Sequence, residues 1–280
     1  AGNMNCVPPV DGFLEGLRTL CTDYGALLVF DEVMTGFRVH PGCAQAHFGV
    51  TPDVTALGKI VGGGMPVGAV GGPAEVMKTL APTGPVYQAG TLSGHPLGMA
   101  AGIATLEQIR GGAVHQAIEP QLDKLLAGLN ERAQQHGVPF LTQSAGAMFG
   151  MFFTEAKTIT RFDEVAACDL DAFSRFFHGL LDNGVYLAPA AFEAAFISRA
   201  HDDAAIQATL EAADKATGRV EYMGDITVPN MAHAKIVRSP FAHATIVSID
   251  AIDARALPGV VCVFTRDELA ADPDIQPVYG

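Results

Sequence analysis

A carboxylate and an amine stand where this chain could do chemistry. Asp31 comes directly after the apolar run of residues 26–30, and Lys59 follows a second apolar run, residues 54–57, by two positions. Short continuous apolar runs are typical of strands buried on both faces of a parallel sheet. Because ligands of open α/β sheets bind at the carboxyl ends of the strands, we expect Asp31 and Lys59 to face one crevice.

Pyridoxal phosphate is a cofactor that uses such a pair of groups. It needs a lysine to hold its aldehyde, and an acid against its ring nitrogen so that the ring stays protonated and can accept electrons. Lys59 and Asp31 could fill these two roles. Alternatively, Asp31 caps a helix and Lys59 is a solvated surface lysine, and spacing alone leaves both interpretations open.

The elements that must position these residues alternate between helices and strands. Helical spacing of apolar residues predicts an amphipathic helix that packs against a sheet, and short apolar runs predict buried strands. A change from glycine-rich loops to regular alternation after residue 110 indicates a second, smaller domain. The predicted helices are residues 12–23, 97–109, 122–129, 170–181 and 206–213, and the further predicted strands are residues 148–153 and 185–187.

Two glycine-containing motifs resemble other catalytic signatures without matching them. The turn at residues 62–64 follows Lys59, but Ile60 stands where a phosphate-binding loop needs Ser or Thr, and no Gly-x-Gly-x-x-Gly fits nearby. Ser93 misses the hydrolase elbow by one residue, which excludes it as a nucleophile. The glycines are more consistent with backbone passing close to a flat cofactor.

Composition excludes several classes of function. The 280 residues are 49% hydrophobic and carry a net charge of -13 without a basic run, which excludes nucleic-acid binding. Five cysteines without Cys-x-x-Cys spacing indicate reduced thiols in a cytoplasmic protein. Nine histidines show no metal-ligand spacing, so we predict no metal site, and prolines interrupt the uncharged residues 79–106, so we predict no membrane span.

Three segments resemble one family of enzymes. The segments are Asp-Glu-Val-Met-Thr-Gly-Phe-Arg at residues 31–38, Leu-Gly-Lys-Ile-Val-Gly-Gly-Gly-Met-Pro-Val-Gly at 57–68, and Ala-Pro-Thr-Gly-Pro-Val-Tyr-Gln-Ala-Gly-Thr-Leu-Ser-Gly at 81–94. They resemble the class III aminotransferase-like group of fold-type I pyridoxal phosphate enzymes, and within it the glutamate-1-semialdehyde 2,1-aminomutase branch. Ordinary class III aminotransferases share the Asp-Glu-Val and Lys positions.

The resemblance, which covers residues 1–216, implies roles for further residues. Asn3 would hydrogen-bond the cofactor's ring hydroxyl, and Val33 would pack against a face of the ring. Gly90 and Thr91 would reach across a homodimer interface to the phosphate of the partner subunit's cofactor, and Glu193 would lie close to the substrate. From local sequence alone, Asn3 reads as a turn residue and Thr91 as a helix cap.

The implied fold and activity follow from the same resemblance. Residues 1–109 would be the C-terminal part of the large α/β domain, with a parallel-rich sheet flanked by helices, and residues 110–216 an α+β small domain. The implied reaction converts glutamate-1-semialdehyde to 5-aminolevulinate in tetrapyrrole synthesis. Lys59 would move protons, and Asp31 would keep the ring an electron acceptor. The phosphate-cradling half of the family lies before Ala1, so we expect an N-terminally incomplete copy that alone is inactive and binds the cofactor weakly.

Residues 217–280 resemble a different family. Their amino-acid sequence, including Val-Arg-Ser-Pro-Phe-Ala-His-Ala at 237–244, is similar to that of the α/β hammerhead domain. This domain opens the large subunit of molybdopterin hydroxylases such as xanthine dehydrogenase. That family's cofactor contacts lie later in its subunit, so no site residue carries over. We expect strands at 234–237, 244–249 and 260–264 and a short helix at 252–256. A non-catalytic fusion and an oxidoreductase fragment remain alternatives to the aminomutase interpretation.

Overall fold

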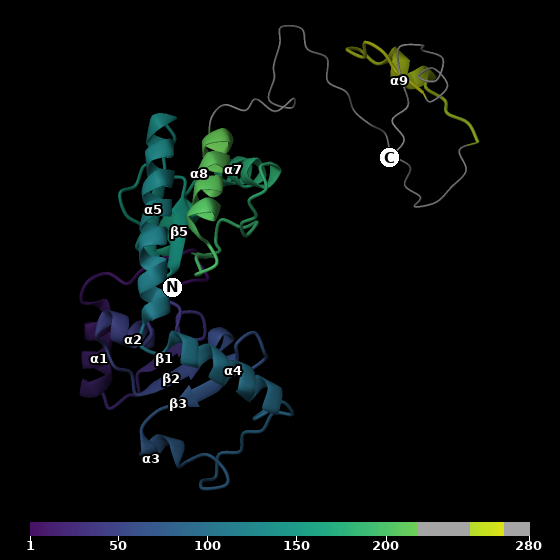
Figure 1. The fold of residues 1–280 in the computed structure, drawn as a ribbon. Coiled ribbons are helices and arrows are strands. Elements are labelled where there is room, and N and C mark those ends of the chain that lie inside the picture. Colours follow the sequence, from purple (N-terminus) through teal and green to yellow (C-terminus); the bar gives the residue numbers. More distant parts are fainter. Residues whose placement is uncertain (218–246, 266–280) are drawn as a thin grey trace. The chain divides into compact units, whose positions relative to one another are not determined.

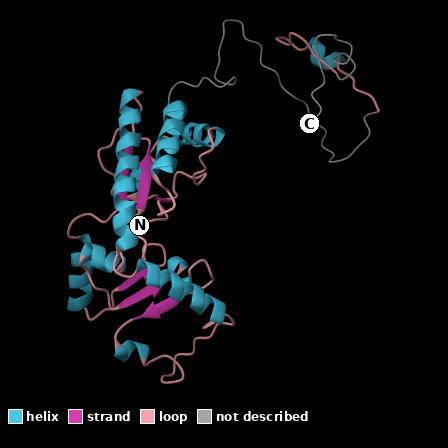
Figure 2. Cartoon of the chain, in the orientation of Figure 1, coloured by secondary structure: helices cyan, strands magenta, loops and turns pink. Residues whose placement is uncertain are grey.

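The computed structural model of the chain describes residues 1–217 and 247–265. The chain divides into two compact units, residues 1–220 and 221–280. The first unit carries both predicted site residues, Asp31 and Lys59, and its two sheets are drawn as separate groups of strands (Figure 1, Figure 2). Each unit is therefore described by itself.

The first sheet of this unit is small and mixed. Strand β1 (Val29–Glu32) pairs in parallel with β2 (Val54–Leu57), which pairs antiparallel with β3 (Ala69–Gly71). The register of the parallel pair places Asp31 beside Ala56 and Glu32 beside Leu57. Around this sheet lie the helices α1 (Phe13–Asp23), α2 (Cys43–Phe48), α3 (Ala74–Met77) and α4 (Pro96–Ile109) and the 3-10 turn η1 (Lys59–Gly62).

Glu32 fastens the end of β1 to helix α2. Its side chain is 1% exposed, and its carboxylate accepts hydrogen bonds from the Thr35 hydroxyl at 2.7 Å and from the backbone N–H groups of Ala44 and Gln45 at 2.7 and 2.9 Å. Both N–H groups belong to the first turn of α2, where they have no partner within the helix. A buried carboxylate with three donors is thus satisfied by local geometry.

The second sheet is antiparallel and belongs to the more C-terminal part of the unit. Strand β5 (Met148–Phe152) lies between β4 (Leu141–Ala145) and β6 (Ala195–Phe196) and is buried along its whole length. Long helix α5 (Ala113–Gln135) leads into it and contributes a buried stripe of apolar residues. The remaining helices are α6 (Phe162–Ala166), α7 (Leu170–Asp182) and α8 (Asp203–Thr217).

Aromatic side chains fill the core of this second part. Phe153, Phe173 and Phe176 pack with ring centroids 5.5 to 6.5 Å apart, which is the range that edge-to-face and tilted aromatic pairs prefer. All three are buried in the cluster that joins α5, α7 and α8. The sequence interpretation of the α7 aromatics as core residues is confirmed.

The first part of the unit departs from the predicted pattern of burial. The apolar run 26–30 forms the strand only in its last two residues, since β1 begins at Val29 and the Leu28 N–H donates to the Asp53 carboxylate at 2.7 Å. Val29 is 56% exposed, and α1 buries no residue among those described, so the predictions of a strand buried on both faces and of a helix packed on a sheet are wrong for this chain.

Residues 185–187 do not form the predicted strand either. The Val185 N–H donates to the Leu180 carbonyl at 2.9 Å, which closes the end of α7. Both edges of β5 are already paired, with β4 on one side and β6 on the other. Val185 and Leu187 instead pack against the core from an irregular segment.

The second unit is described only at residues 247–265. It contains helix α9 (Ile252–Ala256), which confirms the helix predicted at those residues. Residues 260–264 and the described part of 244–249 have no regular structure, so the strands predicted there are absent from the described residues. The strand predicted at 234–237 lies outside them.

Two further properties of the described residues concern membranes and thiols. No helix there is both long enough and apolar enough to cross a membrane. All five cysteines lie within the described ranges and are free thiols, and burial raises the pKa of the Cys6 thiol to about 11.

Replacing Glu32 tests the tie between β1 and α2. Glu32→Ala leaves the Thr35 hydroxyl and two helix N–H groups without their acceptor, and we expect it to lower the free energy of unfolding by about 3 kcal/mol, measured by urea denaturation followed by circular dichroism. The control Glu119→Ala removes an exposed glutamate from α5 and should change stability by less than about 0.5 kcal/mol. Equal effects of the two substitutions would contradict this account of Glu32.

Candidate cofactor-binding site

Asp31 and Lys59 lie at the same edge of the first sheet. Asp31 is the penultimate residue of β1 and pairs with Ala56 of the parallel strand β2, and Lys59 follows Ala56 by three residues at the start of η1. Both side chains are exposed, and among the described residues no salt bridge joins either one to another group. The carboxylate and the amine are thus near in the fold and available to a ligand.

The turn after β1 places Val33 beside the end of strand β2. The Val33 N–H donates to the Asp31 carboxylate at 3.0 Å, which fixes the direction of that side chain. A Cβ on Gly58 would lie 3.0 Å from a methyl carbon of Val33, so the backbone just before Lys59 packs directly against this valine. The fold therefore brings Asp31, Val33 and Lys59 together.

Lys59 has an unusual backbone conformation. Its φ is +51°, in the left-handed region that residues with a Cβ rarely adopt. The following turn, η1, rests on helix α4, where a Cβ on Gly102 would lie 2.5 Å from the carbonyl oxygen of Val61. The turn that contains Lys59 is thus packed closely on α4, and backbone strain of this kind clusters at functional sites.

Asn5 joins the amino-terminal segment to the rest of the unit. This residue is 2% exposed, and its side-chain amide donates to the carbonyls of Met151 at 3.0 Å and Ala191 at 2.7 Å. Its own N–H donates to the carbonyl of Phe192 at 2.6 Å. Asn5 thereby holds together two segments that carry predicted site residues, the one with Asn3 and the one with Glu193.

Asn3 and Glu193 themselves are exposed, and within the described ranges no side-chain hydrogen bond holds either residue. The segment of Asn3 also contacts the turn that follows β1. Gly2 lies against Met34, since a Cβ on Gly2 would clash with the Met34 sulfur, so the segment of Asn3 borders the turn that follows Asp31. Asn5 was not among the predicted site residues, because the partners of its side chain lie far away in the sequence.

Gly90 and Thr91 stand apart from these residues. They belong to an exposed loop between α3 and α4, where the Ser93 N–H donates to the Gly90 carbonyl at 2.9 Å. Thr91 does not cap α4, whose cap position is occupied by His95. Their predicted contact with a partner subunit's cofactor stays a prediction.

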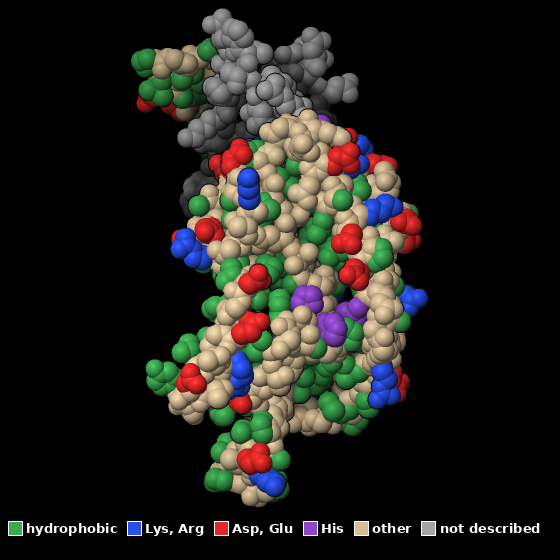
Figure 3. Space-filling model, turned by 90° about the vertical axis from the view of Figure 1, so that its left-hand side faces the viewer, with side chains coloured by type: hydrophobic (Ala, Val, Ile, Leu, Met, Phe, Trp, Pro, Cys, Tyr) green, Lys and Arg blue, Asp and Glu red, His purple; other side chains and the backbone are tan. Residues whose placement is uncertain are grey.

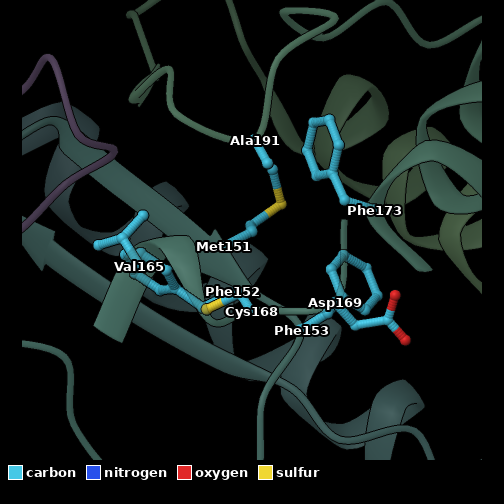
Figure 4. A pocket seen from close by; sticks show the side chains of 8 residues that line it. All are labelled: Met151, Phe152, Phe153, Val165, Cys168, Asp169, Phe173 and Ala191. Atoms are coloured by element: carbon cyan, nitrogen blue, oxygen red, sulfur yellow. The ribbon is translucent and has the colours of Figure 1, made fainter. Parts of the chain in front are cut away.

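The described residues give weaker evidence for a metal site or for a second ligand pocket in the C-terminal part of the unit. No group of three or more His, Cys, Asp or Glu side chains there could hold a metal ion. A cavity in the second part has a volume of about 10 Å³ and is lined by Met151, Phe173 and other apolar side chains, with the Asp169 carboxylate at its margin (Figure 4). That space is enough for one water molecule at most, so it is a packing defect rather than a binding site.

Two known families match separate parts of the chain. Residues 1–213 match the family described as Aminotransferase class-III. Residues 217–276 match the a/b hammerhead domain of aldehyde oxidase and xanthine dehydrogenase. The two predicted resemblances are confirmed at this level.

Solved structures share the fold of the first unit. An omega-transaminase from Sphaerobacter thermophilus is 31% identical with a TM-score of 0.69, and the match covers 77% of this chain and 50% of that one. A beta-phenylalanine aminotransferase from Variovorax paradoxus is 32% identical with a TM-score of 0.65, covering 75% and 48%. A glutamate-1-semialdehyde-aminomutase from Pseudomonas aeruginosa PAO1 in complex with PMP is 24% identical with a TM-score of 0.68, covering 77% and 49%, and supports the fold alone.

The matches also show how much of the related structures this chain covers. It spans about half the length of the structures that it resembles, with coverage of 48% to 50%. The predicted fold, the C-terminal part of a fold-type I transferase followed by an α+β part, agrees with them. Transaminases match as well as the aminomutase does, so the aminomutase branch is not singled out.

The packing of η1 on α4 gives a matched pair of substitutions. Gly102→Ala would press a methyl group against the Val61 carbonyl oxygen, and we expect it to destabilise the protein by about 1–3 kcal/mol. Gly16→Ala lies on helix α1 with open space around its Cβ, and should stabilise by about 0.5–1 kcal/mol through helix propensity. Urea denaturation of both variants measures the difference. Stabilisation by both would show that η1 does not rest on α4 as described.

Proposed function

The chain belongs to the class-III aminotransferase family through residues 1–213, and from this membership we propose that its site transfers an amino group with the aid of pyridoxal phosphate. The observation that carries the proposal is the meeting of Asp31 and Lys59 at one sheet edge, exposed and unpaired among the described residues. Residues 1–109 would supply the cofactor domain and residues 110–216 the small domain.

The residues present fit this cofactor. A flat, charged ring requires an acidic partner at its nitrogen, an amine at its aldehyde and an apolar side chain against its face. Asp31, Lys59 and Val33 offer these three groups from two adjoining turns. The direct contact of Gly58 with Val33 keeps the ring-facing side chain beside the lysine.

Each side chain has a separate task in the proposal. Pyridoxal phosphate, when bound, supplies an aldehyde for covalent attachment and a ring that withdraws electrons from the substrate. Asp31 holds the positive charge at the ring nitrogen. The Lys59 amine retains the aldehyde between turnovers and carries protons to and from the substrate carbon. Asn3 would bind the ring hydroxyl, and Glu193 would border the substrate.

We propose glutamate-1-semialdehyde as the substrate and 5-aminolevulinate as the product, because the sequences of residues 57–68 and 81–94 resemble those of the aminomutase branch. In a cytoplasmic homodimer, Gly90 and Thr91 would approach the phosphate held by the partner subunit, which agrees with their exposed loop. A second candidate is ordinary transamination, which the 31% and 32% identity to two transaminases supports.

Covalent labelling tests the role of the lysine. We expect that reduction with borohydride in the presence of pyridoxal phosphate attaches the label to Lys59 more than tenfold in excess over the exposed Lys78, as measured by peptide mass mapping. Asp31→Asn should reduce the selectivity, because the ring loses the partner of its nitrogen. Because the chain spans about half of its structural relatives, we expect cofactor binding by the chain alone to be weak, and millimolar cofactor should be used. Equal labelling of the two lysines would refute the proposed site.

Product analysis separates the two candidate reactions. An aminomutase moves the amino group within one molecule and so forms 5-aminolevulinate from the semialdehyde with no added amino acceptor. A transaminase requires a separate keto acid. For an assembly of this chain with the complementary half of the fold, we expect 5-aminolevulinate without an acceptor. Strict dependence on an added keto acid would instead identify an ordinary transaminase.

A further inference from the structure

Arg38 links the turn that follows β1 to the segment that carries Glu193. Its guanidinium donates to the Ile197 carbonyl through Nη1 at 3.4 Å, and it lies 5.1 Å from the centre of the Phe196 ring. A guanidinium within about 6 Å of an aromatic ring centre is attracted to the face of that ring. The side chain therefore contacts two successive residues of the Glu193 segment by two different interactions.

The backbone that carries Arg38 is itself held in place. The Arg38 N–H donates to the Thr35 carbonyl at 3.0 Å, and the Thr35 hydroxyl donates to the buried Glu32 carboxylate at 2.7 Å. The Phe37 carbonyl, which can only accept, receives a hydrogen bond from Nε2 of His115 in the first turn of α5 at 2.9 Å. The side chain of Arg38 thus extends from a backbone that is bonded on both sides.

The Arg38 guanidinium has no carboxylate partner among the described residues. Its side chain is half-buried, and burial lowers the pKa of the guanidinium. Figure 3 shows histidine side chains gathered on one face of the unit, and burial lowers the pKa of His115, as do the charges of His40 and Arg38. Basic groups thus lie near the guanidinium, and in the described part of the chain no ion pair draws it away from Phe196 and Ile197.

The residues that follow Glu193 pack on the same two elements. Ala194 is buried in one cluster with Val39, the residue after Arg38. Residues 195–196 form β6, which pairs with the buried strand β5. The segment after Glu193 is therefore attached to the second sheet by β6 and to the turn after β1 by Ala194 and by the Arg38 side chain.

Asn5 holds the segment on the other side of Glu193. Its side-chain amide donates to the Ala191 carbonyl at 2.7 Å, and its backbone N–H donates to the Phe192 carbonyl at 2.6 Å. Glu193 itself is exposed, between these contacts and those of Arg38. The backbone on both sides of Glu193 is thus fixed by a polar side chain from elsewhere in the unit, and the Glu193 carboxylate faces solvent.

We propose that Arg38 is a positioning residue for amino transfer, which fixes the place of Glu193 relative to the edge of the first sheet and so sets how tightly the substrate is held. This role rests on the proposed function, in which Glu193 borders the substrate. Arg38 touches neither cofactor nor substrate in that proposal and acts through residues 196 and 197. Its loss would leave Asp31 and Lys59 in place, because strand pairing positions them, and would loosen the substrate side alone.

Hydrogen exchange of the 280-residue chain, measured by mass spectrometry, tests the link itself. In Arg38→Met, an uncharged side chain of similar length, we expect the amides of residues 194–198 to exchange about tenfold faster, because the segment loses a charge-assisted hydrogen bond and a cation–π contact. Peptides from β1 and β2 should change less than about twofold. Arg38→Lys, which keeps a charge for the Phe196 ring, should restore part of the protection. The control Arg175→Met, at an exposed position of α7, should exchange like the unaltered chain. Unchanged exchange in Arg38→Met would overturn the proposal.

Kinetics separate positioning from simple stabilisation. For the chain assembled with the complementary half of the fold, we expect Arg38→Met to raise KM for the substrate about fivefold and to change kcat less than about twofold. Because Arg38 acts through Glu193, the same substitution in a Glu193→Gln background should have little further effect on KM. A lower kcat with unchanged KM, or an equal rise of KM in both backgrounds, would show that Arg38 only stabilises the fold.

Lysine labelling distinguishes a failure of this role from a failure of the proposed function. In Arg38→Met we expect borohydride labelling to favour Lys59 over Lys78 as strongly as in the unaltered chain. Selective labelling of Lys59 together with unchanged exchange of residues 194–198 would overturn the role of Arg38 alone. Absence of selective labelling in the unaltered chain would refute the amino-transfer site, and with it the task given to Arg38, whatever the exchange of that segment.

Discussion

The buried carboxylate of Glu32 is the constraint on which the candidate site depends. Successive residues of a strand point to opposite faces, so burying Glu32 sends the neighbouring Asp31 carboxylate outward. Two N–H groups of α2 and the Thr35 hydroxyl satisfy Glu32, which folds the chain tightly after β1 and returns Val33 toward Gly58 and Lys59. One acidic residue thus supplies structure, and its neighbour stays free for chemistry.

Asn5 plays the corresponding part between segments distant in sequence. Its amide occupies the carbonyls of Met151 and Ala191, 146 and 186 residues away, and so holds the amino-terminal segment on the second sheet. A Cβ on Gly150 would lie 2.2 Å from the Asn5 side-chain oxygen, so this approach requires a glycine in β5. Sheet pairing positions Asp31 and Lys59, whereas a single buried amide positions the segments of Asn3 and Glu193. The two groups of predicted site residues therefore depend on different parts of the structure.

Local pattern predicted the part of the site that depends on strand order. The runs before Asp31 and Lys59 do end at neighbouring parallel strands, and α4, α7 and α8 form close to their predicted limits. The roles of Glu32 and Asn5 were not predictable from local pattern. Glu32 is satisfied by the first turn of the next helix, 12 and 13 residues on, and Asn5 by carbonyls 146 and 186 residues away. The apolar residues of α1 and β1 misled for a related reason: periodicity reveals which face is apolar, but not whether any described part of the chain covers it.

The candidate cofactor site rests on the position of exposed groups together with family membership. Exposed groups such as Asp31 and Lys59 are satisfied by water, so their meeting at a sheet edge indicates opportunity rather than need, and family membership must supply the chemistry.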